Sequence, residues 1–321
     1  MAVLLGAALT AGPAGAVQVK TQFDPTGSGS WSITGITSWD WEDTGTLVIE
    51  NNLAYSTTGD TTLDDFFSNA GVGDIAQFYI HGQARLKGFT GGTDASGKTL
   101  YTEGASSADY EVTTTFDALE TAILDFDLFG RPRLNFVGIS GTFQYYLDST
   151  FDSVVETGAG FRDGDPAANP FLWGTIDAVS GDFLADTADS SNTGGNSNLT
   201  LTITGYNSSV IETDPASSGV WLVGTTFNTN IDITANIGTT NYLGNGLSSG
   251  TSVAVGDSPY SFNVGTFDTT LGTLRGQNGE LILRADASST FSAVPEPGTM
   301  ILLGSGLVGL AGVSRRRRKS A

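Results

Sequence analysis

The chain has 321 residues, 39% of them hydrophobic, which is enough for one large domain or two small ones. It contains no cysteine, which excludes disulfides, thiolate metal sites and thiol nucleophiles. The net charge is −20, and because five of the 14 basic residues stand together at 315–319, the chain before them carries 34 acidic and nine basic residues. Such a charge repels phosphates and anionic lipid, so we exclude nucleic acid as a partner and expect neutral, basic or divalent-cation partners.

Residues 1–16 are typical of a secretory signal peptide. An apolar stretch at 2–9 is followed by Gly12-Pro13 and by Ala14-Gly15-Ala16, a small-residue pattern that suits cleavage after Ala16. The basic segment that ordinarily comes first is missing, which indicates a truncated signal peptide or a start assigned too far downstream. A buried N-terminal helix is the alternative, which the Gly-Pro break disfavours. We therefore expect export, with a mature extracytoplasmic domain at 17–293.

Between residues 17 and 293, apolar side chains recur mostly at every second position. In 77–87, for example, Phe78, Ile80 and Leu86 alternate with polar residues, which predicts a half-buried strand. Within 273–283, Asn278-Gly279 separates two apolar runs and predicts a type I′ hairpin turn. Further strands are predicted at 31–37, 46–56, 109–117, 134–147, 199–204, 219–227, 231–237 and 259–268. Short helices are predicted at 62–70, with Gly71 as C-cap, and at 116–124.

The fold class follows from these alternating strands. Antiparallel strands with one wet face and one apolar face bury the apolar face against a second sheet. We therefore predict an all-β fold, an antiparallel β-sandwich or jelly-roll-like domain with one or two short helices. A parallel β-helix is disfavoured because no short fixed repeat is present. The stretch 156–198 is rich in Gly, Asp, Asn and Ser, which predicts a long binding loop or a seam between two sandwiches.

Enzyme motifs give little support to catalysis. Residues 92–99 match the P-loop pattern, but no helix is predicted after them, and phosphate binding by such a loop needs one. His81 is the single histidine, predicted as a solvated cross-strand partner, with neither a nucleophile elbow nor a zinc cluster beside it. Two carboxylates would suffice for a glycoside hydrolase, but sequence spacing cannot select a pair. We expect a non-enzymatic protein.

Two binding sites are hypotheses that compete with ordinary structural explanations. Asp163, Asp165 and Asp182 are candidate calcium ligands, because acidic flexible loops suit that ion, although Asx turns explain the same pattern. Trp39 and Trp41 fall on one face of a strand, where exposed rings would stack on sugars and buried rings would belong to the core. Calcium is the one cofactor considered, and otherwise none is expected.

Residues 294–321 combine three features of a membrane-sorting tail. Pro295-Glu296-Pro297 holds an extended backbone of the kind that proteases bind. Residues 299–313 are apolar and interrupted by glycines, and as a transmembrane helix of about 22 Å they are short for a hydrocarbon core of ~30 Å. A basic cluster then stays cytoplasmic by the positive-inside rule. Its members are Arg315, Arg316, Arg317, Arg318 and Lys319.

Residues 294–319 resemble the PEP-CTERM sorting signal of Gram-negative bacteria that make exopolysaccharide. In that family an exosortase, a membrane cysteine protease, recognises the tripeptide, here Pro295, Glu296 and Pro297, and removes the anchor. The resemblance implies a transient inner-membrane anchor, followed by location at the cell surface or in the extracellular matrix.

Residues 23–29 are loosely similar to flocculation-associated members of the tagged proteins. The leading hypothesis is therefore a non-enzymatic protein associated with exopolysaccharide, biofilm or floc formation. A lectin-like carbohydrate-binding module, calcium-dependent or not, is the alternative. A glycoside hydrolase or lyase acting on the exopolysaccharide is a further one.

Overall fold

A computed structural model describes the greater part of the domain expected at 17–293. The described residues are 17–26, 33–42, 44–91, 93–94, 110–148, 152–154, 159–162, 169–186, 193–214, 222–234, 249–255, 260–268, 271 and 273–293.

The described elements are strands with a single short helix, α1 (Leu63–Asn69). The strands of the main sheet are β1 (Val17–Gln18), β4 (Ser38–Trp41), β5 (Gly45–Ser56), β6 (Ile75–Thr90), β8 (Glu111–Phe126), β9 (Pro132–Asp148), β10 (Leu172–Leu184), β11 (Gly194–Tyr206), β13 (Thr226–Thr234), β14 (Ser252–Ala254), β15 (Ser261–Asp268), β16 (Thr273–Gly276) and β17 (Leu281–Ala293). A four-stranded sheet comprises β12 (Ile211–Thr213), β2 (Thr21–Phe23), β3 (Ile33–Ile36) and β7 (Thr93–Asp94).

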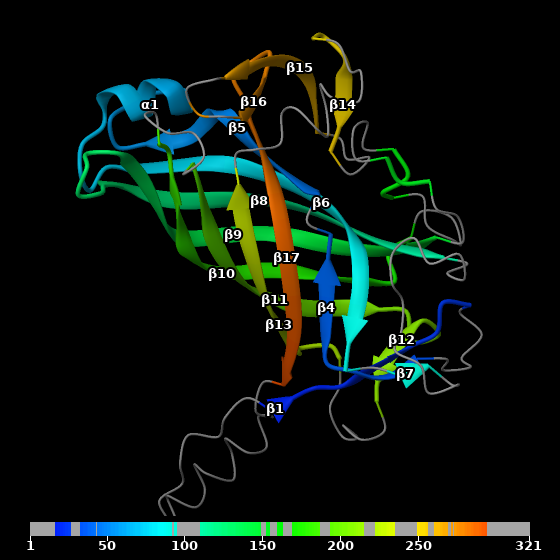
Figure 1. The fold of residues 1–321 in the computed structure, drawn as a ribbon. Coiled ribbons are helices and arrows are strands. Elements are labelled where there is room, and N and C mark those ends of the chain that lie inside the picture. Colours follow the sequence, from blue (N-terminus) through cyan, green and yellow to red (C-terminus); the bar gives the residue numbers. More distant parts are fainter. Residues whose placement is uncertain are drawn as a thin grey trace, which may run out of the picture.

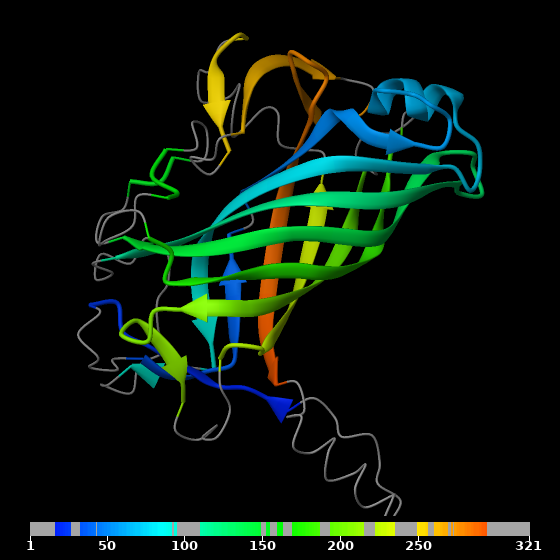
Figure 2. The ribbon, with the colours of Figure 1, turned by 180° about the vertical axis from the view of Figure 1, so that it is seen from behind.

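The main sheet closes on itself as an antiparallel barrel (Figures 1 and 2). Going round, the order is β17, β13, β11, β10, β9, β8 and β6, with β4 and β5 sharing the last position between β6 and β17. Closure comes from the ladder between β13 and β17, which runs from Thr226 opposite Ser292 to Thr234 opposite Arg284. The all-β antiparallel prediction is confirmed, but the predicted sandwich is wrong, because the apolar face packs against the far side of the same sheet.

The core fills the inside of the barrel. In β13, Phe227, Thr229, Ile231 and Ile233 point inward and are buried. The residues between them, such as Asn228 and Asn230, are exposed. Aromatic rings gather around Trp39, whose ring centroid lies 5.1 Å from that of Phe89 and 5.5 Å from that of Tyr145. An eight-stranded barrel is just wide enough for its inward side chains to fill it, and here they do.

Two smaller groups of strands lie at opposite ends of the barrel (Figure 1). The sheet formed by β12, β2, β3 and β7 contributes Phe23, Ile33 and Ile36 to the main core and so covers one end. The extension β14–β16 instead packs on the outside of β5 and β17, where Val48 and Ile282 face outward. These two join Val253, Val255, Phe262, Val264 and Leu274 in a second, smaller core.

The two predicted helices have opposite outcomes. The helix predicted at 62–70 is confirmed as α1, with Thr62 as N-cap accepting a hydrogen bond from the Asp65 amide at 3.1 Å. Its C-cap is Ala70, in extended backbone, rather than the predicted Gly71. The helix predicted at 116–124 is wrong, because that stretch lies inside β8 between β6 and β9. Helix-forming Ala and Leu residues there face the core at every second position, so tertiary pairing overrides their propensity.

Two further predictions concern the hairpin at 273–283 and the stretch 156–198. The hairpin at 273–283 is confirmed, because β16 and β17 pair antiparallel and Gly279 has a φ of 89°, which favours glycine. The predicted type I′ turn is wrong, because hydrogen bonds between Gly276 and Glu280 and between Gly279 and Gly276 enclose a three-residue loop, 277–279. The stretch 156–198 contributes β10 and the beginning of β11, both members of the same closed sheet. The described part of that stretch therefore contains barrel strands where a seam or a long loop was predicted.

Candidate functional site

The predicted sorting residues, Pro295, Glu296 and Pro297 with the basic cluster at 315–319, lie outside the described residues. The predicted transmembrane segment at 299–313 lies outside them as well. Within the described ranges, no helix has the length and apolar character that crossing a membrane requires.

Trp39 and Trp41 lie in the barrel core, so the predicted sugar platform at these residues is wrong and the alternative, core packing, is correct. Their exposed fractions are 0% and 2%, and the two ring centroids are 5.9 Å apart. The indole Nε1 of Trp41 donates to Ser289 Oγ at 3.1 Å, which fixes the ring inside the barrel. Neither ring presents a face to a sugar.

The structure describes only one of the three predicted calcium ligands, so the calcium hypothesis stays a prediction. Asp163 and Asp165 lie outside the described ranges. Asp182, on β10, forms an ion pair with Arg133, whose Nε lies 3.2 Å from Asp182 Oδ2. Ion pairs of this kind are ordinary for partly exposed acids, so Asp182 by itself gives no support to a cation site.

A different acidic group comes together at the ends of β8 and β9. Carboxylate oxygens of Glu111, Asp148 and Asp152 lie within 4.8 Å of one another. Glu111 is buried and accepts from the Ser153 amide at 3.0 Å and from the Ser153 hydroxyl at 2.8 Å. Burial raises the pKa of the Glu111 carboxyl, and the Ser153 hydrogen bonds partly oppose that rise. The Ser153 amide and hydroxyl and the Asp152 amide thus hold the Glu111 carboxylate in place within this group.

His81 is at the centre of a polar group on the outer face of the barrel. Its Nδ1 lies 2.7 Å from Asp117 Oδ1, directly opposite on β8, and its Nε2 lies 2.9 Å from Glu50 Oε1 on β5. The Tyr260 ring stacks on the imidazole, with centroids 3.8 Å apart and planes at 8°. Arg162 also pairs with Asp117, at 3.2 Å. The prediction of a cross-strand partner is confirmed, but the prediction that it is solvated is wrong, because Tyr260 covers it.

This arrangement raises the pKa of His81. Desolvation lowers the pKa of the imidazole, and the hydrogen bonds and charges of Asp117 and Glu50 outweigh it, so the net pKa is raised. Each ring nitrogen lies within hydrogen-bond distance of a carboxylate, Nδ1 of Asp117 and Nε2 of Glu50. His81 therefore links β8 to β5 through both nitrogens of its ring.

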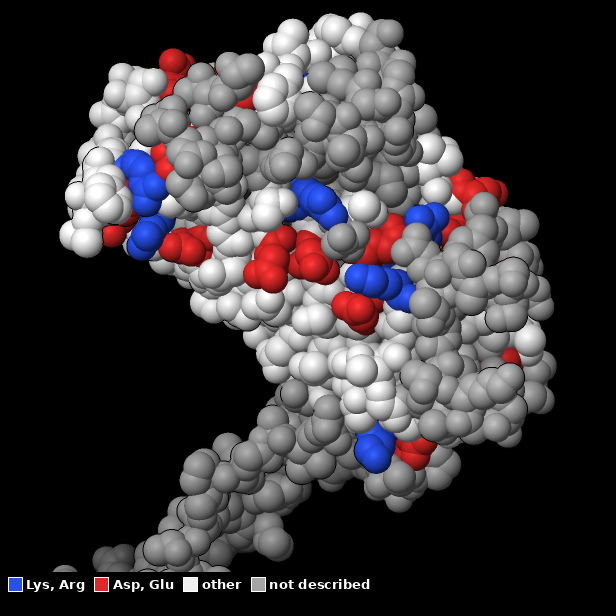
Figure 3. Space-filling view, viewed as in Figure 1, with Lys and Arg blue, Asp and Glu red and all other residues white. Residues whose placement is uncertain are grey.

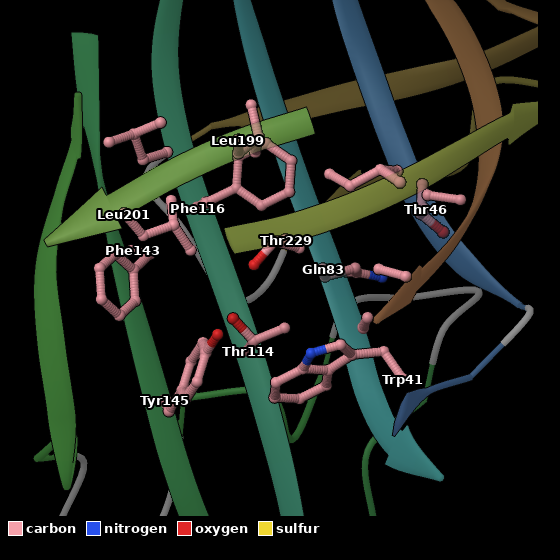
Figure 4. A pocket seen from close by; sticks show the side chains of 15 residues that line it. Trp41, Thr46, Gln83, Thr114, Phe116, Phe143, Tyr145, Leu199, Leu201 and Thr229 are labelled. Atoms are coloured by element: carbon pink, nitrogen blue, oxygen red, sulfur yellow. The ribbon is translucent and has the colours of Figure 1, made fainter. Parts of the chain in front are cut away.

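Inside the barrel a small cavity of about 50 Å³ remains (Figure 4). Figure 4 shows Trp41, Phe116, Phe143 and Tyr145 pointing toward it, and its lining is mostly apolar. Ligand pockets usually measure several hundred cubic ångströms, whereas this cavity has room for little more than a water molecule or two. A sugar does not fit inside the described barrel.

Glu120 is a buried acid on the inner face of β8. Its side chain lies among inward-facing residues, with Phe78 and Ile139 opposite on the neighbouring strands, and its Oε1 has no hydrogen-bond partner among the described residues. Burial raises the pKa of this carboxyl to about 8. At neutral pH Glu120 is therefore mostly protonated. An acid at an inward position of an alternating run is a signal that could have identified Glu120, but the helix predicted at 116–124 obscured the alternation.

Charged side chains of both signs are mixed on the outer surface. Figure 3 shows acidic and basic side chains next to each other across the described part of one face, with no continuous basic area. Several form ion pairs, including Arg85 with Glu42 and Arg131 with Asp127 and Asp186. On the described part of this face, nothing resembles a surface for phosphate recognition.

Comparison with known proteins identifies one segment. Residues 293–318 match the family model of the PEP-CTERM protein-sorting motif. No curated protein and no solved structure matches the chain.

Proposed function

The chain carries a PEP-CTERM protein-sorting motif at 293–318, and from this premise we propose that it is a non-enzymatic protein of the exopolysaccharide matrix. It is exported, held in the inner membrane by its C-terminal segment, and cleaved by an exosortase at the motif. The released domain then associates with exopolysaccharide at the cell surface, in biofilm or in floc. The observation that carries the proposal is the motif itself, which contains Pro295, Glu296 and Pro297.

Three properties of the described residues are consistent with a non-enzymatic matrix protein. The barrel encloses a cavity of only about 50 Å³, too small for a saccharide. The imidazole of His81 is occupied by Asp117 and Glu50. The closed sheet protects most strand edges without disulfides, which suits a cysteine-free protein outside the cell.

The test follows the protein through its processing. Cells expressing the full chain, a chain without residues 294–321, and Glu296→Ala are separated into membrane, medium and matrix, and each recovered protein is measured by mass spectrometry. We expect a shortened wild-type protein in the matrix, uncleaved Glu296→Ala in the membrane, and no matrix retention of the deletion variant. Asp65→Ala, which removes an exposed acid from α1, is the matched control and should behave as wild type.

Two results would overturn the proposal. Equal matrix retention of the deletion variant would remove the role of the sorting segment. Release of reducing ends from the cells' exopolysaccharide by the processed protein would contradict the non-enzymatic assignment.

A further inference from the structure

The outer face of the barrel carries a regular array of uncharged polar side chains, which we name the outer polar grid. Its members alternate along β9, β10, β11, β13, β17, β4 and β6 with the buried residues of the core. One row runs across four strands through Thr142, Thr175, Thr202 and Thr226. The next runs through Thr200, Asn228, Thr290, Ser38 and Thr90. A third runs through Ser180, Asn198, Asn230 and Ser288.

Strand register sets the spacing of the grid. Neighbours within a row are about 4.8 Å apart across the strands, and neighbouring rows are about 7 Å apart along them. Hydroxyl and amide groups therefore repeat in two directions over several strands. Such a repeat matches a partner that itself repeats, in particular a polymer with hydroxyl groups on every unit.

Hydrogen bonds inside the grid hold its side chains without saturating them. Asn230 Nδ2 donates to Asn198 Oδ1 at 2.9 Å, and Ser38 Oγ donates to Thr90 Oγ1 at 2.6 Å. A carboxamide has two donor hydrogens and an oxygen that accepts twice, so Asn198 and Asn230, both exposed, keep donors and acceptors directed to solvent. Partly ordered amides lose less side-chain entropy on binding than free ones.

Trp173 adds an aromatic surface beside the first row. It stands on β10 two residues from Thr175, and 38% of it is exposed. Its ring lies over Gly205 on β11, where a Cβ atom would be only 2.2 Å from Cζ2 of the indole. Because Gly205 has no side chain, the ring can lie against the sheet with its other face toward solvent. An aromatic face of this kind packs on the C–H face of a sugar ring, while hydroxyls at the ring edge reach polar neighbours.

The surrounding charges decide which polymer fits. None of the grid residues is ionisable, but Asp40, Asp177, Asp232 and Asp286 lie around it as exposed acids, and the whole chain has a net charge of −20. A polymer of uronic acids would be repelled, whereas an uncharged polysaccharide would not. We propose that the outer polar grid and Trp173 bind an uncharged polysaccharide chain. This inference rests on the proposed function, since it names the surface that would hold the domain in the matrix.

The binding test is affinity electrophoresis of the full chain, purified in mild detergent, through gels that contain one polysaccharide each. The probes are dextran and galactomannan, which are uncharged, the exopolysaccharide of the producing cells, and alginate, which is a polyuronate. We expect retardation by at least one uncharged polymer and none by alginate. Trp173→Ala should weaken binding about three- to tenfold, the loss expected for one aromatic contact. The pair Asn198→Ala with Asn230→Ala should weaken it about three- to tenfold as well, the loss expected for one hydrogen bond.

Two variants control for structural damage. Trp173→Phe keeps an aromatic face over Gly205 and should keep most of the binding. Tyr79→Ala removes an aromatic ring of similar exposure, 44% against 38% for Trp173, from the outer face of β6 beyond the grid and should bind as wild type. Circular dichroism and the unfolding midpoint of each variant show that the fold is retained.

The inference is wrong if Trp173→Ala is retarded as strongly as wild type, or if alginate retards the chain as strongly as the uncharged polymers do. It is also wrong if no uncharged polymer retards the chain, or if sedimentation shows that the retardation comes from self-association. The two proposals fail separately. If matrix retention depends on 294–321 but not on Trp173, polysaccharide binding by the grid is refuted and the proposed sorting role is kept. If the chain binds an uncharged polymer in the gel but never enters the matrix, the proposed function is refuted and polysaccharide binding by the grid is kept.

Discussion

The inner and outer faces of the barrel are built from the same strands and differ in almost every chemical respect. On β13, Phe227, Ile231 and Ile233 face a close-packed interior, while Asn228 and Asn230 face solvent. The inner face uses large residues of different shapes, each fitted to its neighbours. The outer face repeats small polar residues across strands. The inner face therefore specifies the fold, whereas the outer polar grid is available for binding.

The largest difference in stability between the two faces is expected when a tryptophan on each face is replaced by alanine. Trp39→Ala removes a fully buried ring that contacts several other aromatic rings, and we expect it to cost about 3–5 kcal/mol of unfolding free energy. Trp173→Ala should cost about 1 kcal/mol or less, because much of that ring is already in water. Urea denaturation of both variants measures the difference, and similar losses at the two positions would contradict the division between the faces.

Glu120 is the inner-face residue that breaks the apolar pattern, and its effect depends on pH. Its pKa is raised from 4.5 to about 8 in the folded protein, so above pH 4.5 the unfolded chain releases a proton that the folded protein keeps. Stability is therefore lost as pH rises from about 4.5 to about 8, at about 1.4 kcal/mol per pH unit. Glu120→Gln avoids this cost, so it should match wild type near pH 4 and exceed it by roughly 3 kcal/mol at pH 7.

Urea unfolding of wild type and Glu120→Gln between pH 4 and pH 8 measures this growing gap. A gap that stays constant over that range would mean that Glu120 is ionised in the folded protein. It would also mean that a group outside the described residues stabilises the carboxylate.

His81 is the outer-face counterpart, with a pKa shift that has the opposite consequence. Its folded pKa is raised above 6.5 because Asp117 and Glu50 outweigh desolvation. The stabilisation is fully present below pH 6.5 and is lost as pH rises through the folded pKa. His81→Gln should therefore cost about 1–3 kcal/mol at pH 6 and less at high pH.

The chain has a single histidine, so one imidazole signal in an NMR titration reports the pKa directly. The midpoint should lie above 6.5. Asp117→Asn should move it down, since the substitution removes the carboxylate opposite the ring. A midpoint below 6.5 in wild type would show that desolvation by Tyr260 wins over the two acids.

Much of the inner face was predictable from the sequence, because alternation is a local property. The strand at 77–87 and the turn at Asn278-Gly279 needed only neighbouring residues. Barrel closure was not predictable in this way. The pairing of β13 with β17 joins distant segments, and inward alternation looks the same in a sandwich and in a barrel.

The candidate sites were harder to predict, since they depend on long-range contacts. The alternation in 77–87 predicts that His81 faces solvent. In the folded protein Tyr260, which is distant in sequence, stacks on the imidazole and covers it. Trp173 was not singled out as a surface residue, because β10 has register shifts at Trp173/Gly174 and Ile176/Ala178 that interrupt its alternation. Trp39 and Trp41 were candidates for a sugar platform because they share one face of a strand, but that spacing fits two core residues equally well.

The smallest change in unfolding free energy is expected at the outer polar grid. It tests most directly whether the inner face serves folding and the grid serves binding. Asn198→Ala and Asn230→Ala each remove one exposed amide and their mutual hydrogen bond, so each should change the unfolding free energy by about 0.5 kcal/mol or less. The same two substitutions should still weaken polysaccharide retention, because binding depends on groups that folding does not use. Thermal unfolding and affinity electrophoresis on the same samples separate the two quantities. If stability and binding fall together at Asn198 and Asn230, the outer face is part of what holds the barrel, and the division between a folding face and a binding face does not hold.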